Sequence, residues 1–174
     1  MNTFLKRIEK KDIAILKSIN NSLSCKILDF IMTPITYLGS LSFSILFCIF
    51  TIINPNKTIH NLGISTCITL AFSASMVQII KTSVSRIRPF LKVTNLNIKK
   101  IGIDKHSFPS GHTTAAFSIA ITTSFFYHNH VIMYIGLAVM VGISRIYLGV
   151  HYPTDVLAGM FLGSLCSFLV YTFI

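Results

Sequence analysis

The sequence predicts an all-α fold: a polytopic membrane helical bundle of about six transmembrane helices, preceded by an amphipathic helix in the membrane interface. Hydrophobic residues make up 52% of the 174 residues and charged residues only 11%, whereas roughly 25% of the residues of an ordinary soluble domain are charged. The apolar residues form long runs separated by short polar segments. We expect two regions, the N-terminal interfacial helix over residues 1–25 and the membrane domain over residues 26–174.

The first 25 residues combine an apolar stripe with many basic side chains. The apolar residues follow one another at intervals of three, seven, four and four, on one side of a helix: Leu5, Ile8, Ile15, Ile19 and Leu23. The lysines lie elsewhere around this helix, as is typical of a helix that rests on a membrane surface. No apolar run with a small-residue cleavage site follows directly, so a removable signal peptide is not expected.

The rest of the chain alternates apolar segments with turns. Residues 30–53 carry no charge, but Pro34 and the step from Gly39 to Ser40 interrupt them, so this segment is either one long span or two short helices. A turn follows at residues 54–57. Further spans are expected over residues 61–85, 110–127, 131–148 and 153–172, with a polar loop over residues 90–109 and a tight turn at residues 128–130.

The formal net charge of +10 favours a lipid partner over nucleic acid. The lysines and arginines fall in short segments between apolar runs and do not form one basic face, so no nucleic acid is expected and anionic lipid is the better partner. The four cysteines lie apart, without the spacing of a metal or redox pair, and are expected to be packing residues: Cys25, Cys48, Cys67 and Cys166.

Three polar clusters lie between the apolar segments. They comprise Lys81 with Arg88-Pro89, then residues 109–112 (Pro-Ser-Gly-His), then residues 144–155, which contain Arg145, His151 and Asp155. The first cluster lies at the end of one span, the second at the start of the next, and the third follows two further crossings. All three clusters are therefore expected on the same face of the membrane.

The cations of these clusters suit a phosphoryl group, whose oxygens need positive charge around them during transfer. Lys81 and Arg88 are seven residues apart, on one stripe of a continuous helix, whereas Arg86 lies about 140° away and is expected to point elsewhere. The alternative is basic side chains that reach from a helix end to the head groups. The position of Lys81 several residues inside an apolar helix argues against it, because a charge without a counter-charge is costly there. Lysine is not expected to substitute for Arg88 or Arg145, because only a guanidinium binds two phosphate oxygens in parallel.

Residues 110–112 begin a predicted helix that is suited to an anion. Ser110 is a natural N-cap, and Gly111 permits close approach of the backbone to a ligand. The free N–H groups of a first helical turn bind phosphate well. His112 is expected to donate a proton to the leaving oxygen. The plain alternative is an ordinary helix start with a histidine at the interface.

His151 and Asp155 have the spacing of a histidine and its orienting carboxylate. A carboxylate on one imidazole nitrogen fixes the tautomer and leaves the other nitrogen free to attack. His151 is therefore the predicted nucleophile, which forms a phosphohistidine that water hydrolyses. Asp155 would also suit the first turn of a helix without any catalytic role.

The remaining histidines lack such partners. No catalytic role is expected for His60, His128 and His130, which lie in turns on the opposite face. His106 lies in the loop on the site's face, where contact with lipid head groups is a secondary alternative. No histidines, cysteines and carboxylates recur with metal-ligand spacing, so neither a metal nor another cofactor is expected.

The motifs K-x6-R-P, P-S-G-H and S-R-x5-H-x3-D, in this order over residues 81–155, resemble the type 2 phosphatidic acid phosphatase family. Its members are membrane relatives of bacterial acid phosphatases and vanadium haloperoxidases. The resemblance implies that His112 is the acid, His151 the nucleophile and Asp155 its orienting partner. It also implies six spans and an extracytoplasmic site, which are common among bacterial members.

We therefore expect a lipid phosphatase of the cell membrane. Small bacterial members of this design often act on undecaprenyl diphosphate, which is the preferred expectation. Others act on phosphatidylglycerophosphate, phosphatidic acid or lipid A. A phosphotransferase that passes the phosphoryl group to an alcohol fits the same residues. A small lipid transporter would need its cations through the midplane, whereas these gather near one face.

The orientation depends on residues 26–53. If they cross twice, the basic N-terminus lies opposite the site, and the positive-inside rule places the site on the extracytoplasmic face. If they cross once, nearly all positive charge lies on the site's face, which would then be cytoplasmic. The family resemblance favours two crossings and an extracytoplasmic site.

Overall fold

The computed structural model describes residues 3–98 and 106–173, and the regular elements of this part are helices. In chain order these are α1 (Thr3–Lys17), α2 (Lys26–Tyr37), α3 (Leu41–Ile52), α4 (Lys57–Val84), α5 (Pro89–Lys92), α6 (Gly111–Phe126), α7 (Val131–Tyr147) and α8 (Pro153–Phe173). A π-helical turn at Ser18–Ser22 extends α1, and a short turn at His128–His130 precedes α7. Three basic residues of the expected polar loop, Lys99, Lys100 and Lys105, lie outside the described residues.

Within the described residues, three helices are long and apolar enough to cross a membrane: α4, α8, and α7 with its preceding turn. The helices α2 and α3 add a fourth crossing if they form one span, which is bent by 54°. Each has 12 residues and is about 18 Å long, shorter than the roughly 30 Å of bilayer hydrocarbon. Each is too short to cross such a layer alone, so two crossings in residues 26–53, and with them about six spans, are not confirmed.

The break between α2 and α3 lies against the start of α6. The hydroxyl of Ser40 accepts a hydrogen bond from the N–H of Phe43 and caps α3. A Cβ atom at Gly39 would overlap the carbonyl oxygen of His112. Glycine at this corner therefore lets the broken span touch the first turn of α6.

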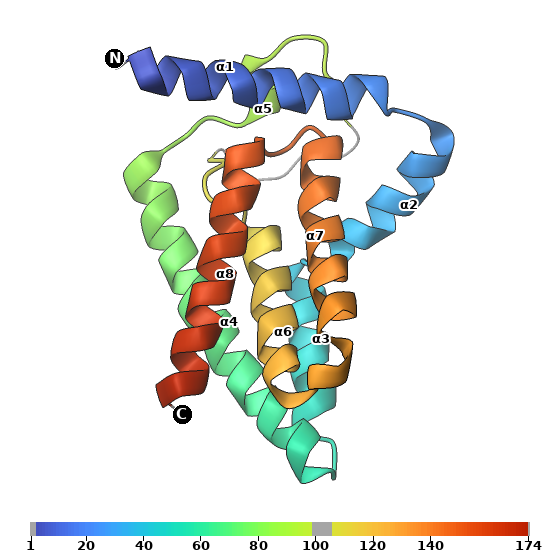
Figure 1. Ribbon diagram of the computed structural model, residues 1–174, viewed down its shortest axis with the longest axis vertical. Helices are drawn as coiled ribbons and strands as arrows, with labels where there is room; N and C mark the ends of the chain where they lie inside the picture. Colours follow the sequence, from blue (N-terminus) through green and yellow to red (C-terminus); the bar gives the residue numbers. More distant parts are fainter. Residues whose placement is uncertain (1–2, 99–105, 174) are drawn as a thin grey trace.

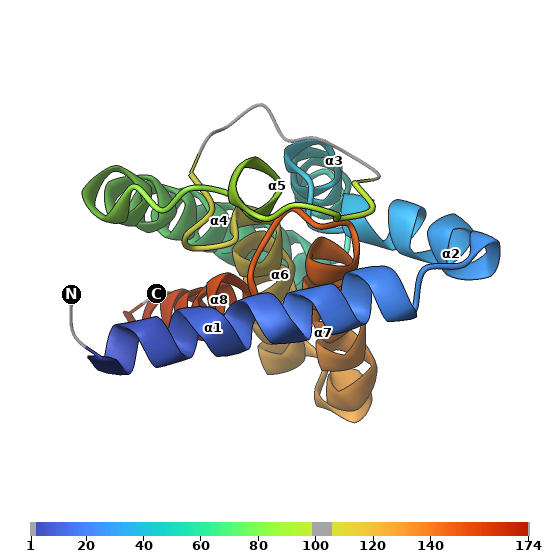
Figure 2. The ribbon, with the colours of Figure 1, turned by 90° about the horizontal axis from the view of Figure 1, so that it is seen from above.

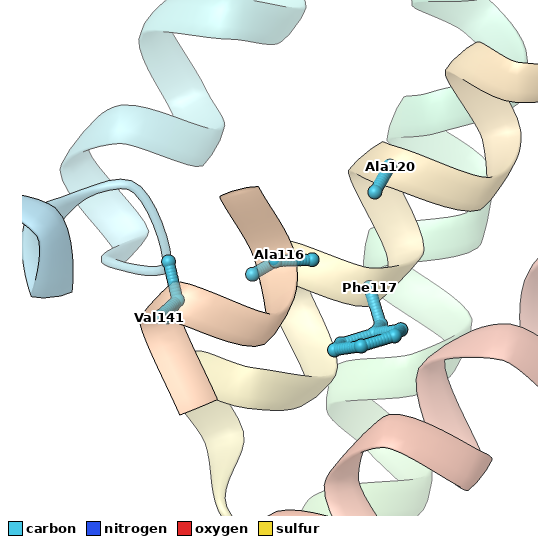
Figure 3. Packing of buried hydrophobic residues seen from close by; sticks show 5 residues of the cluster. Ala116, Phe117, Ala120 and Val141 are labelled. Carbon is cyan, nitrogen blue, oxygen red and sulfur yellow. The ribbon is translucent and has the colours of Figure 1, made fainter. Parts of the chain in front are cut away.

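Helix α6 is the centre of the bundle, because α4, α7 and α8 pack around it and most of its side chains are buried. Ala116, Phe117 and Ala120 belong to one buried apolar cluster with Val141 of α7 (Figure 3). Toward α8 the contact is closer, since a Cβ atom at Gly163 would overlap the carbonyl oxygen of Thr114. Gly159, Gly163 and Ser167 form a series of small residues four apart, the pattern that lets membrane helices approach closely.

Helix α1 lies across the end of the bundle, over the ends of α7 and α8 (Figures 1 and 2). Leu16 is fully buried there in a cluster with Ile146, Tyr152 and Val156. On other sides of α1 the side chains of Lys6, Arg7, Lys10, Lys11 and Lys17 are exposed. The two-crossing interpretation placed this helix opposite the third polar cluster, whereas the structure places it beside that cluster. Residence of α1 in the membrane interface stays a prediction.

Replacing Gly163 by Ala is expected to destabilise the protein, because the added methyl group forces α6 and α8 apart. Overpacking of this kind costs about 1–3 kcal/mol, which a lowered midpoint of thermal unfolding in detergent would show. The matched control is Gly136→Ala on α7, where an added Cβ meets no atom within 4 Å. Equal midpoints for the two variants would contradict the close α6–α8 contact.

Candidate active site

A cavity of about 750 Å³ lies between α3, α4 and α6 and reaches the loops that precede α5 and α8. Six of the eight predicted site residues line it: Lys81, Arg88, Gly111, His112, Arg145 and His151. Asp155 and Ser110 do not line it. The rest of the lining combines apolar side chains with small polar ones: Leu41, Leu70, Ala74, Val77 and Ala115, with Ser44, Ser73 and Thr114. The structure thus brings the three polar clusters to one place, while the chemical role of each residue stays a prediction.

His151 is 1% exposed and lies in the loop between α7 and α8, with its two ring nitrogens in different surroundings. Nε2 lies 3.3 Å from Nη1 of Arg88, while Nδ1 lies 3.6 Å from Oδ2 of Asp155. The second distance exceeds that of a hydrogen bond, but the carboxylate is the charged group on the Nδ1 side. A proton on Nδ1 leaves the electron pair of Nε2 directed at the cationic side of the site.

Asp155 links the second and third polar clusters. Its side chain is fully buried, and Oδ2 accepts a hydrogen bond of 2.9 Å from the N–H of Tyr152. Its backbone carbonyl accepts a hydrogen bond of 3.0 Å from the N–H of Ser110. One residue at the start of α8 therefore holds both the histidine loop and the start of α6.

Two buried guanidinium groups face the cavity. Arg88 is 4% exposed and donates to the carbonyl oxygen of Val150 at 3.1 Å. Arg145 is 5% exposed and donates to the hydroxyl of Thr36 at 2.9 Å, while its Nε is buried and has no hydrogen-bond partner. A buried donor of this kind calls for an acceptor, and oxygens of a bound phosphate would supply one.

The helical stripe predicted for Lys81 and Arg88 is wrong, although both residues reach the cavity. Helix α4 ends at Val84, and Ser85 adopts a left-handed conformation with φ 48°. Arg88 then stands at the N-cap position of the separate helix α5. Lys81 and Arg88 reach the same cavity because the chain changes direction after α4. The spacing of seven residues did not predict this change of direction.

Arg86 does not line the cavity, as expected, but it binds two carboxylates behind it. Its Nη1 donates to Oδ1 of Asp155 at 2.6 Å, and its Nη2 donates to Oδ2 of Asp12 at 2.7 Å. The sequence analysis missed Arg86 and Asp12 as parts of the site. Nothing in their local sequence pointed to a contact between residues 74 positions apart.

Ser110 occupies the N-cap position of α6, but its side chain makes no cap hydrogen bond. It is fully buried, its N–H is bonded to Asp155, and its hydroxyl accepts from Oγ1 of Thr113 at 2.9 Å. The structure places Ser110 behind the cavity wall, where it anchors the start of α6. Gly111 lines the cavity, and a Cβ atom there would find its nearest contact only at 3.9 Å.

The other histidines lie away from the cavity. Nδ1 of His60 lies 2.6 Å from the carbonyl oxygen of Ile52, at the far end of α4, and His106 pairs with Ile87. Within residues 3–98 and 106–173, no three His, Cys, Asp or Glu side chains are grouped so that they could hold a metal ion.

Comparison with known proteins identifies relatives over most of the chain. The family model described as the PAP2 superfamily matches residues 62–174. Phosphatidylglycerophosphatase B of Bacillus subtilis is 33% identical over 80% of this chain and 72% of its own length. The bacitracin transport permease protein BcrC of Bacillus licheniformis is 43% identical over 50% of this chain, and an undecaprenyl-diphosphatase of Sulfolobus acidocaldarius is 33% identical over 65%. This chain spans only 43% and 55% of the lengths of these last two relatives.

Two solved structures share the fold. LpxE of Aquifex aeolicus superposes with a TM-score of 0.81 at 28% identity and covers 92% of this chain and 94% of that chain. The first transmembrane PAP2-type phosphatidylglycerolphosphate phosphatase from Bacillus subtilis superposes with a TM-score of 0.79 at 29% identity. The match covers 96% of this chain and 86% of that chain.

The acid limb of the pH profile of kcat/KM is expected near pH 4. Burial lowers the pKa of His151 to about 4, which nearby Asp155 opposes and the charges of Arg145 and Arg88 reinforce. The imidazole is therefore neutral and able to attack above about pH 4, and activity falls as the pH drops through that value. A basic limb is expected where His112 loses its proton, because His112 must be charged to act as an acid. The control is the unfolding midpoint at each pH; an acid limb near 6.5, the ordinary value for histidine, would contradict the buried site.

Proposed function

The chain belongs to the PAP2 superfamily, and from this premise we propose that it removes a phosphate group from a lipid phosphate or diphosphate at the membrane surface. The single observation that carries the proposal is the composition of the cavity. The cavity brings Lys81, Arg88 and Arg145 together with His112 and His151, and its remaining lining contains apolar side chains beside small polar ones. A phosphorylated head group suits the cations, and the first part of a hydrocarbon tail suits the apolar side chains.

The reaction proceeds in two steps. Nε2 of His151 attacks phosphorus, the bond from phosphorus to the leaving oxygen breaks, and His112 gives that oxygen its proton. A water molecule then attacks the phosphohistidine, gives a proton to His112 and releases inorganic phosphate. The cations hold the non-bridging oxygens throughout, where negative charge must be stabilised.

Undecaprenyl diphosphate is the substrate that this proposal favours. A diphosphate carries more negative charge than a phosphate monoester, and three cations line the cavity to receive it: Lys81, Arg88 and Arg145. A volume of about 750 Å³ lies within the range of ligand pockets and holds a head group with only the first part of a tail. One relative is named undecaprenyl-diphosphatase, which agrees with this preference.

The face of the membrane is a separate part of the proposal. The structure places the basic helix α1 at the site's end, beside α7 and α8, so the positive-inside rule taken alone favours a cytoplasmic site. The resemblance to bacterial phosphatases with external sites favours the extracytoplasmic face of the cell membrane. We retain the extracytoplasmic face, because the substrate proposal rests on the same resemblance.

Purified protein in detergent is expected to release phosphate from undecaprenyl diphosphate with a higher kcat/KM than from phosphatidylglycerophosphate, phosphatidic acid or lipid A. The screen is run with EDTA present, since the proposed chemistry needs no metal. His151→Ala is the matched negative control and is expected to fold and to release no phosphate. Release from none of these lipids, or release that His151→Ala retains, would refute the phosphatase proposal.

Cys25 provides a native reporter for the membrane face. It is exposed, and its carbonyl oxygen lies 3.5 Å from the hydroxyl of Tyr147, at the site's end of the bundle. A membrane-impermeant maleimide is expected to label Cys25 in intact cells, with Cys25→Ser as the control. Labelling only after the cells are opened would place the site on the cytoplasmic face.

A further inference from the structure

An aspartate of α1 is buried against the catalytic loop. Asp12 is 2% exposed, although the neighbouring turns of α1 carry exposed lysines. Its Oδ1 accepts a hydrogen bond of 3.1 Å from the N–H of Thr154, and its Oδ2 accepts from the hydroxyl of Thr154 and from Arg86. A buried carboxylate with this many donors is tightly fixed in position.

Arg86 connects this aspartate to Asp155. One nitrogen, Nη1, donates to Oδ1 of Asp155 at 2.6 Å and to the hydroxyl of Thr154 at 2.7 Å, while Nη2 donates to Asp12. The guanidinium carbon lies 4.0 Å from the ring centre of Tyr152, so the flat group is also stacked. The planar fork thus has one orientation, with a carboxylate at each side.

The chain of contacts ends at the nucleophile. Oδ1 of Asp155 faces Arg86, and Oδ2 of the same carboxylate faces Nδ1 of His151 at 3.6 Å. Neither Asp12 nor Arg86 lines the cavity, so neither touches the substrate there. The most direct route from this pair to His151 passes through Asp155.

We propose that Asp12 and Arg86 are a positioning pair, through which the N-terminal helix fixes the carboxylate that orients His151. This inference rests on the proposed function and extends it to a helix outside the three catalytic motifs. Without Asp12, Asp155 is the carboxylate to which Arg86 remains hydrogen-bonded. The guanidinium then turns both arms toward Asp155 and draws the carboxylate from His151.

The same helix supplies a matched control. Glu9 forms an ion pair with Lys92 of α5, so it too ties α1 to the loop after α4. This pair is more exposed, and Glu9 acts on Arg86 only through its charge, without a hydrogen bond to it. If α1 acted only as an anchor, loss of Glu9 and loss of Asp12 would have similar effects.

The test compares Asp12→Asn, Arg86→Gln, the double variant and Glu9→Gln in the full-length protein, with undecaprenyl diphosphate as substrate. Asp12→Asn and Arg86→Gln are each expected to lower kcat roughly 10- to 100-fold, with KM within about twofold of wild type. The double variant is expected to be no slower than the slower single variant, because the two residues act as one unit. Glu9→Gln is expected to match wild type.

A kcat within twofold of wild type for Asp12→Asn would overturn the inference, as would equal losses in Asp12→Asn and Glu9→Gln. If Asp12→Asn does not fold, the kcat of Arg86→Gln is the test instead, because the Arg86 side chain is partly exposed and its replacement disturbs the fold less. A kcat within twofold of wild type for Arg86→Gln would then overturn the inference. If the wild-type protein releases no phosphate from any lipid, the proposed function fails, and histidine ¹⁵N NMR decides about the pair. A changed His151 signal in Asp12→Asn but not in Glu9→Gln supports the positioning role, and an unchanged signal refutes it.

Discussion

Buried positive charge is the constraint on which the rest of this structure depends. Arg88 and Arg145 are almost completely buried at one end of the bundle, close enough for their charges to repel. A buried cation is stable only where acceptors surround it, and Arg145 still has a buried Nε without one. A bound phosphoryl group would supply both the missing acceptors and the opposite charge. The site therefore gains stability from the ligand that the proposed reaction requires.

Close contacts between helices hold this charged end together. Gly39 lets the broken α2–α3 span touch His112, and Gly159 and Gly163 let α8 approach α6. Where α6 and α8 begin, the carbonyl oxygen of Asp155 accepts a hydrogen bond from the N–H of Ser110. Small residues in the membrane domain thus allow the segments that carry His112 and His151 to approach closely, although glycine itself has no reactive side chain.

The sequence predicted the site better than the path of the chain. Convergence of Lys81, Arg88, His112, Arg145 and His151 followed from counting crossings between motifs. The stripe that joined Lys81 to Arg88 was wrong, because Ser85 ends α4 in a left-handed conformation that its sequence does not specify. Asp12 and Thr36 escaped notice because their partners are distant in the chain. The predicted number of spans is not confirmed, because Pro34 and Gly39 mark a break without showing whether the chain reverses there.

The central claim is that His151 attacks phosphorus and carries the phosphoryl group. The most direct measurement mixes the protein with undecaprenyl diphosphate radiolabelled in its terminal phosphate and stops the reaction in alkali, in which phosphohistidine survives. Peptide mapping should find the label on His151, and the His151→Ala variant should carry none. Label on another residue, or wild-type turnover without labelled protein at any time, would contradict the account.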